Sequence, residues 1–136
     1  MHLRTGTASD LDAVLAFWET ATTVPSATDD AESLVALLER SPDALIVADD
    51  NGALVGTAIA GWDGWRGAMY RVAVHPDARR RGIASAMIAE GERRLRARGA
   101  RRLHMIVNVD EAPALEFWSS AGYARTDQSR FVKTLD

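Results

Sequence analysis

The segment from Val72 to Ser85 has the residue types and spacing of a phosphate-binding turn. An apolar strand ends at His75-Pro76, the three arginines Arg79–Arg81 follow, and Gly82 precedes a long amphipathic stretch. The first turn of a helix leaves its backbone N–H groups without intrahelical partners, and the helix dipole adds partial positive charge there, so such a turn binds anions. Because Gly82 has no Cβ, a phosphate could reach the backbone.

The same residues resemble the Arg/Gln-x-x-Gly-x-Gly/Ala signature of the GNAT superfamily of N-acyltransferases, here as Arg79-x-x-Gly82-x-Ala84. In that family the loop holds the pyrophosphate of acetyl-CoA. Two further stretches are similar to the family, the hairpin at Gly52 to Gly56 and the late helix in Phe117-Trp118-x-x-x-Gly122-Tyr123. The resemblance therefore covers nearly the whole chain and implies acetyl-CoA as the acyl donor.

The resemblance also implies roles for the residues around the loop. The backbone of Val72–Val74 would pair with the pantetheine arm, and the N–H of Val74 would lie near the thioester carbonyl. Such a donor stabilises the oxyanion that forms when an amine attacks. Backbone N–H groups from Arg80 to Ser85 would hold the pyrophosphate. The expected cofactor-binding residues are Val72, Ala73, Val74, Arg79, Arg80, Arg81, Gly82, Ile83, Ala84, Ser85, Asn108, Glu111 and Trp118.

The general acid of the family has no equivalent at its usual position in this sequence. Many members have a tyrosine in the late helix that can reprotonate the leaving thiolate, and Trp118 stands there instead. An indole N–H does not titrate usefully, so this role is unfilled at that position. The family's usual asparagine aligns with Glu111, or with Asn108 if the loop is shorter, and both are expected to contact the cofactor.

The general base is also missing from its usual strand, which reads Ala-Met-Tyr-Arg at 68–71. The remaining candidates are Asp63, Glu19, Glu111, Tyr70 and His75. His75 has an ordinary pKa near neutrality, but Val-His-Pro at this strand end favours a structural cap. Strand alternation puts Tyr70 on the face of Val72 and Val74, which could be core or cleft. We expect Val74, Tyr70 and Asp63 in the catalytic set, while an amine could also lose its proton through water.

An acceptor pocket is expected among the first two helices, their loop and the aromatic turn at 62–67. Trp62, Trp65, Asp29 and Asp30 combine aromatic faces with carboxylates, which suits an ammonium group through cation–π attraction. Trp18 falls on the apolar face of the first helix and is expected in the core. The acceptor would be a small primary amine or a peptide N-terminal or lysyl amine.

Charge is distributed unevenly along the chain. Residues 1–63 carry two basic and eleven acidic side chains, whereas residues 64–136 carry fourteen basic and eight acidic ones. One interpretation is an anionic cofactor on the second half and a cationic acceptor on the first, and the other is drift on a solvated surface. A nucleic-acid interface is disfavoured, because the net charge is −3 and no RNA-binding motif is present.

The elements that must position these residues follow from periodicity and turn signals. Strands are predicted at 2–5, 44–49, 53–61, 68–75, 101–107, 123–126 and 130–135, and helices at about 10–20, 30–40, 81–98 and 111–121. The order β-α-α-β-β-β-α-β-α-β-β indicates an α/β (α+β) domain over residues 1–136. The resemblance implies a mixed, mostly antiparallel sheet of 6–7 strands flanked by about four helices.

Composition narrows the location and the mechanism. The chain has no Cys, no run of about 18 apolar residues and no basic-then-apolar start, so we expect a cytoplasmic protein without a membrane span or a metal site. Without a cysteine acyl carrier, direct transfer to the amine in a ternary complex is expected. The alternative is a module of the same fold that binds acyl-CoA without turnover. A homodimer is compatible with the resemblance.

Overall fold

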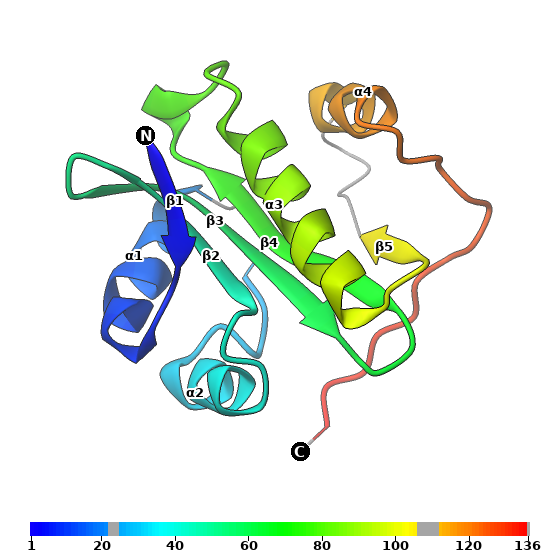
Figure 1. Ribbon diagram of the computed structural model, residues 1–136, viewed down its shortest axis with the longest axis horizontal. Helices are drawn as coiled ribbons and strands as arrows, with labels where there is room; N and C mark the ends of the chain where they lie inside the picture. Colours follow the sequence, from blue (N-terminus) through cyan, green and yellow to red (C-terminus); the bar gives the residue numbers. More distant parts are fainter. Residues whose placement is uncertain (22–24, 106–111, 136) are drawn as a thin grey trace. The chain divides into compact units, whose positions relative to one another are not determined.

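A central sheet of five strands organises the first 105 residues (Figure 1). The computed structural model describes residues 1–21, 25–105 and 112–135. The strands lie in the order β1-β2-β3-β4-β5, and all neighbours are antiparallel except β4 and β5. Their bounds are β1 His2–Thr5, β2 Leu45–Asp50, β3 Ala53–Trp62, β4 Gly67–Val74 and β5 Leu103–Met105.

Helices connect these strands in the predicted sequence. They are α1 (Leu11–Ala21), α2 (Ala31–Arg40), α3 (Ile83–Arg98) and α4 (Ala112–Ser120), with short 3₁₀ turns at Ala8–Asp10 and Pro76–Ala78. Because α3 connects β4 to β5, these two strands can run parallel. The predicted α/β architecture with a mixed, mostly antiparallel sheet is therefore confirmed for the elements from β1 to α4. Among the described residues, no helix has both the length and the apolar character needed to cross a membrane.

The two strands predicted after α4 are absent from the structure, so the expected total of 6–7 strands is wrong for the described residues. Residues 123–126 and 130–135 form no strand. Phe131, Val132 and Leu135 are exposed, with Phe131 at 96%. An alternating pattern specifies a strand only where one face can be buried, and here neither apolar face is buried.

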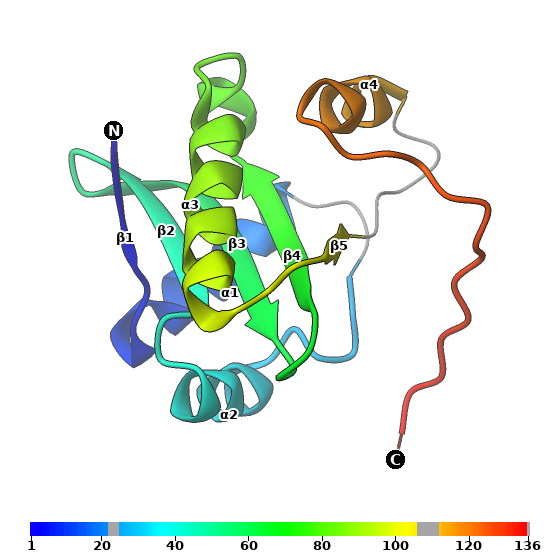
Figure 2. The ribbon, with the colours of Figure 1, turned by 45° about the vertical axis from the view of Figure 1, so that its right-hand side comes forward.

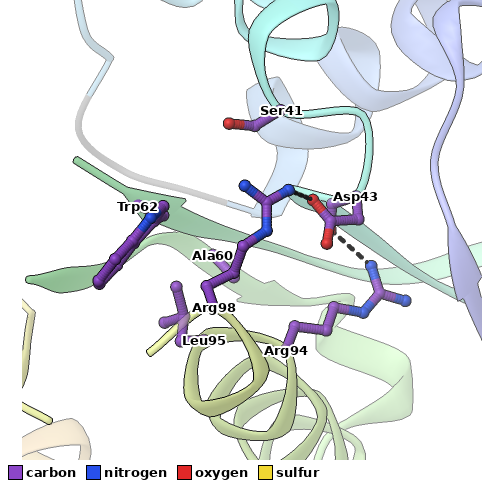
Figure 3. A pocket seen from close by; sticks show the side chains of 7 residues that line it. All are labelled: Ser41, Asp43, Ala60, Trp62, Arg94, Leu95 and Arg98. Atoms are coloured by element: carbon purple, nitrogen blue, oxygen red, sulfur yellow. Dashed lines mark hydrogen bonds and ion pairs between the residues drawn. The ribbon is translucent and has the colours of Figure 1, made fainter. Parts of the chain in front are cut away.

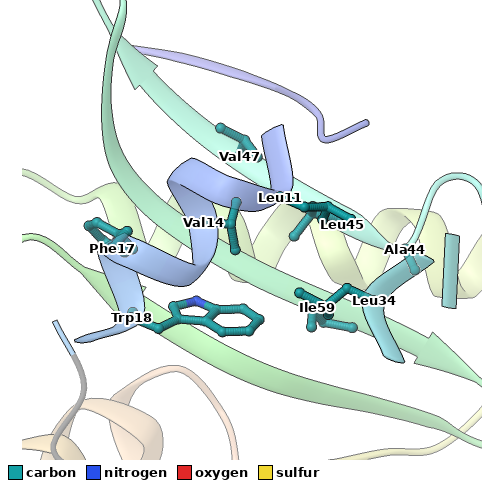
Figure 4. Packing of buried hydrophobic residues seen from close by; sticks show 10 residues of the cluster. Leu11, Val14, Phe17, Trp18, Leu34, Ala44, Leu45, Val47 and Ile59 are labelled. Atoms are coloured by element: carbon teal, nitrogen blue, oxygen red, sulfur yellow. The ribbon is translucent and has the colours of Figure 1, made fainter. Parts of the chain in front are cut away.

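Both faces of the sheet are buried, by α1 and α2 on one side and by α3 on the other (Figures 1 and 2). In β2 the alternation is direct, since Leu45 and Val47 join one core while Ile46 and Ala48 join the other. Figure 4 shows the α1 side, where Trp18 lies in the core as predicted. The α3 side is filled by Ile46, Ala48, Ala58, Ala60, Met69, Ile83, Met87 and Leu95.

Left-handed residues end the elements where the sequence predicts turns. Asn51 and Gly52 have φ of 55° and 88°, the pair of positive values that a type I′ hairpin needs between β2 and β3. Gly99, at φ 107°, ends α3, and Ala100 donates its N–H to the Leu95 carbonyl at 3.0 Å. This is the Schellman arrangement, which satisfies carbonyls at the helix end.

Residues 106–136 form a second compact unit, in which α4 is the regular element of the described part. The helix ends at Ser120, Gly122 follows with a left-handed backbone, and Tyr123 donates its N–H to the Trp118 carbonyl at 3.0 Å. The Trp118 ring makes edge-to-face contacts with Phe117 and Tyr123, at centroid distances of 5.0 and 5.7 Å. These contacts fix the orientation of the indole within this unit.

Candidate functional site

The turn between β4 and α3 presents an open helix N-terminus. Arg80 and Gly82 both have left-handed backbones, with φ of 64° and 77°. Left-handed residues in such turns aim successive N–H groups into a concavity that suits anions. Gly82 is the N-cap of α3, and no side chain caps the first turn. A Cβ built on Gly82 would meet nothing within 4 Å, so the space in front of the turn is free.

The three arginines beside this turn are not equivalent. Arg81 donates to Asp50 at 2.9 Å, and this hydrogen bond lowers the pKa of the Asp50 carboxyl below its usual value. Arg79 and Arg80 are exposed and form no hydrogen bond or ion pair with the rest of the described chain. Two of the three cations are therefore available to a phosphate. Sequence reasoning missed Asp50, because its pairing with Arg81 joins positions 31 residues apart.

The strand before the turn contains a β-bulge. Thr57 pairs with Ala73, but Ile59 pairs with Tyr70, so that two residues of β4, Arg71 and Val72, oppose a single residue of β3. Such an extra residue interrupts the ladder and bends the strand. Arg71 carries the strain of this bulge, with a φ of 49°.

The bulge reverses the side-chain alternation along β4. Tyr70 faces the α1 side with its partner Ile59, whereas Val72 and Val74 pack in the α3-side core. The expectation that these three side chains share a face is therefore wrong, because the inserted residue changes the period. Tyr70 is 50% exposed, and its ring packs against the backbone of Gly61.

His75 supports the chain where β4 ends. Its Nδ1 accepts the N–H of Asp77 at 3.1 Å, at the start of the 3₁₀ turn that leads into the arginines. This hydrogen bond uses the nitrogen lone pair that a general base would need. The geometry agrees with the expected structural cap.

Asp63 closes its own turn between β3 and β4. Its Oδ1 accepts the N–H groups of Trp65 and Arg66, both at 2.7 Å. The hydrogen bond from Arg66, followed by that from Trp65, lowers the pKa of the Asp63 carboxyl. A carboxylate with a lowered pKa is a weaker proton acceptor, so the geometry favours a turn-forming role for this side chain.

The two carboxylates expected to bind the acceptor have internal partners. Asp29 forms a two-pronged ion pair with Arg71 of the bulge, in which Arg71 Nε lies 2.9 Å from Asp29 Oδ1. Asp30 caps α2, since its Oδ1 accepts the Ser33 N–H at 2.7 Å, and this hydrogen bond lowers its pKa. Arg71 is the residue that sequence reasoning missed here, and its only signal was a charge inside an apolar strand.

The aromatic residues of the predicted acceptor set lie elsewhere. Trp62 is on the α3 side, where it lines a cavity of about 10 Å³ beside Arg94 and Arg98 (Figure 3). That volume has room for about one water molecule and is too small for an amine substrate. Trp65 is 71% exposed, and the guanidinium of Arg66 lies 4.0 Å from its ring centre. The structure therefore does not bring Trp62, Trp65, Asp29 and Asp30 together in one pocket.

Most arginines at the C-terminal half of α3 are neutralised by ion pairs. Glu90 pairs with both Arg93 and Arg94, and Arg98 pairs with Asp43. The hydrogen bond from Arg93 is the main cause that lowers the pKa of Glu90 to about 2. Such paired side chains offer little net positive charge to a polyanion.

Several predicted positions belong to the second unit or lie beyond the described chain. Asn108 and Glu111 are outside the described residues. Trp118 lies on α4 with the ring contacts given above. Within the described ranges, no group of three or more His, Asp or Glu side chains is placed to hold a metal ion.

Comparisons with known proteins agree with this fold and turn. The sequence model of the acetyltransferase (GNAT) family matches residues 11–123. A protein named acetyltransferase from Pectobacterium atrosepticum is 35% identical over 99% of this chain and 96% of its own length. The chain therefore belongs to the GNAT acetyltransferase family.

Solved structures show the same fold at low sequence identity. Ard1 from Thermoplasma volcanium superposes with a TM-score of 0.81 at 20% identity, covering 92% of this chain and 83% of that one. The protein Rv2747 from Mycobacterium tuberculosis, solved in complex with CoA and NLQ, gives a TM-score of 0.75 at 18% identity, covering 97% of this chain and 76% of that one. These similarities support the GNAT architecture for residues on both sides of the β4–α3 turn.

Proposed function

We propose that this protein is an acetyl-CoA-dependent N-acetyltransferase that transfers the acetyl group directly to an amine. The observation that carries the proposal is the uncapped N-terminus of α3 behind the left-handed residues Arg80 and Gly82. A diphosphate is the ligand that such a turn suits, because its charge complements the N–H groups and the helix dipole. Family membership supports coenzyme A as the molecule that carries this diphosphate.

The residues present fit this cofactor. The free space before Gly82 leaves room for a phosphate against the backbone. The guanidinium groups of Arg79 and Arg80, which form no ion pair among the described residues, can neutralise it. The N–H groups from Arg80 to Ser85 would hold the pyrophosphate. The backbone of Val72–Val74 would pair with the pantetheine arm, with the N–H of Val74 near the thioester carbonyl.

The reaction needs a thioester, which acetyl-CoA supplies when it is bound. The amine nitrogen forms a bond to the carbonyl carbon, the carbon–sulfur bond breaks, and the thiolate leaves with the electron pair and takes up a proton. The role of the protein is to orient the two reactants and to donate a hydrogen bond to the developing oxyanion. Since the sequence has no cysteine, no acyl thioester can form on this chain, and the amine attacks acetyl-CoA directly.

Proton transfer is the least specialised part of the proposed site. Asp63 Oδ1 and His75 Nδ1 both accept hydrogen bonds within the chain. Tyr70 is the proposed catalytic side chain, because it lies next to the bulge and half of it is exposed. The amine would lose its proton to water, because β4 contains no acidic residue.

The acceptor is proposed to be a small primary amine or a peptide N-terminal or lysyl amine. A second candidate function is an acyl-CoA-binding module without turnover. The observation that favours it is the internal engagement of Asp29, Asp30 and Asp63, each of which accepts hydrogen bonds from within the chain.

A thiol-release assay over a panel of amines distinguishes these two functions. Because the protein has no Cys, a thiol reagent reports released coenzyme A without a background from the protein. We expect turnover with at least one small or peptide amine, and loss of turnover in an Arg79→Glu, Arg80→Glu variant. Acetyl-CoA binding without thiol release from any amine class would contradict the transferase and support the binding module.

A further inference from the structure

A buried hydrogen-bond chain holds the backbone of the β4 bulge. Trp18 Nε1 donates to Thr57 Oγ1 at 2.8 Å, and Thr57 Oγ1 donates to the Arg71 carbonyl at 3.1 Å. Thr57 is fully buried, and its hydroxyl both accepts and donates within this chain. A helix residue, α1's Trp18, is thereby connected to the peptide group of the bulge.

The Arg71 side chain is held by two further contacts. Its guanidinium pairs with both carboxylate oxygens of Asp29 and lies 5.5 Å from the centre of the Trp18 ring. Both charged side chains are mostly buried, at 19% and 18% exposure, which strengthens the pair relative to a surface one. Asp29 also accepts the Ser26 N–H at 2.9 Å, so the loop before α2 is connected to the same point.

These contacts explain how an arginine keeps a left-handed backbone within a strand. A positive φ is uncommon for residues other than glycine, and it persists only where the surroundings determine it. At Arg71, the carbonyl, the guanidinium fork and the face of the guanidinium are each held by a different side chain. The bulge is therefore an imposed conformation of the folded chain.

The bulge sets the register of the strand segment that follows it. With it, Ala73 pairs with Thr57 and Val74 pairs with Gly56, and the side chains of Val72 and Val74 point into the α3-side core. Without the extra residue, each position from 72 to 74 would face the opposite side, because side chains in a strand alternate with a period of two. Backbone N–H groups in this segment would be re-aimed as well.

We propose that Asp29, Trp18 and Thr57 act through Arg71 as positioning residues, which hold the bulge so that the N–H of Val74 points at the thioester of acetyl-CoA. This inference rests on the proposed function, since it assigns a task to the strand that would bind the pantetheine arm. Small displacements of such a donor have large effects on rate. The pyrophosphate-binding turn, by contrast, depends on residues 79–85 and not on this cluster.

Infrared spectroscopy of bound acetyl-CoA labelled with ¹³C at the carbonyl tests the proposal. A hydrogen bond to the thioester lowers its carbonyl stretching frequency. In Asp29→Asn and Arg71→Gln we expect that frequency to rise toward the value in water, while titration with ADP, which carries the diphosphate without the pantetheine arm, gives an unchanged Kd. Arg71→Gln removes the ion pair and leaves a residue for which a positive φ is unfavourable. Arg71→Lys should give an intermediate frequency, because lysine lacks the two-pronged geometry.

A matched control is Asp43→Asn. Asp43 lies on the loop before β2 and its carboxylate is paired with Arg98 of α3. This substitution should leave the carbonyl frequency at the wild-type value. Folded cluster variants with the wild-type frequency would overturn the proposal. If the wild-type protein itself does not bind acetyl-CoA, the proposed function fails and this inference fails with it, an outcome that is distinct from binding with an unchanged frequency.

Discussion

A Gly82→Ala substitution separates the energetic cost of the backbone conformation from the cost to ligand binding. Gly82 has a φ of 77°, and a Cβ built on it would meet nothing within 4 Å. The left-handed conformation costs a residue with a side chain about 1–2 kcal/mol, and no clash adds to that here. We expect the free energy of unfolding to fall by about this amount.

The matched control is Gly64→Ala in the turn between β3 and β4. Gly64 has a φ of 94° and equally free surroundings, so its loss of stability should also be about 1–2 kcal/mol. It lies far along the chain from the β4–α3 turn, and coenzyme A should bind to this variant as it binds to the wild type.

The two variants should differ in ligand affinity. In the alanine variant, residue 82 would relax away from its positive φ and turn backbone N–H groups away from the phosphates. A hydrogen bond to a charged group is worth about 1.5–3 kcal/mol. The Kd for coenzyme A should therefore rise by about tenfold to 150-fold in calorimetric titration. Urea denaturation supplies the stability values. An unchanged Kd in Gly82→Ala, together with the expected loss of stability, would refute the assignment of the phosphate site.

Two further predictions concern charge. Arg80→Gln should weaken coenzyme A binding more than Arg81→Gln does, because Arg81 is already paired with Asp50, and titration at low salt would show the order; equal losses would contradict the distinction. Asp10 is paired with Arg4 at 2.8 Å, and the hydrogen bond lowers its pKa from 3.8 to about 2. Its contribution is therefore present above about pH 4 and is lost as the pH falls toward 2. Since both side chains are partly exposed, about 1 kcal/mol should separate wild type from D10N in urea denaturation at pH 7 and vanish near pH 2; a constant difference would contradict this.

The turn between β4 and α3 could be predicted from the sequence because its signals are local. Val72 to Pro76, the arginines and Gly82 lie within one short segment, and helix propensity, proline and glycine act on neighbouring residues. The same holds for the Asn51-Gly52 hairpin and for Gly99, which the structure confirms as left-handed residues at element ends.

The bulge and its contacts could not be predicted in the same way. Asp29 and Arg71 are 42 residues apart, and Trp18 and Thr57 are 39 residues apart, so their pairing depends on how the elements pack. A single inserted residue changes the face of every later side chain in the strand, so strand alternation wrongly places Tyr70 on the same face as Val72 and Val74.

The segment after α4 shows the limit of residue propensity. Phe131, Val132 and Thr134 are residue types that favour strands, yet the structure has no strand there. Strand formation depends on cross-strand neighbours and burial, and propensity alone supplies neither.

Calorimetric titration of the wild-type protein with acetyl-CoA tests the central claim, with the Arg79→Glu, Arg80→Glu variant as its partner. We expect saturable binding to the wild type, which weakens as salt is raised, and strongly reduced binding to the charge-reversed variant. Absence of binding to a folded wild-type protein, or equal binding to both proteins, would contradict the assignment of the β4–α3 turn as the acetyl-CoA site.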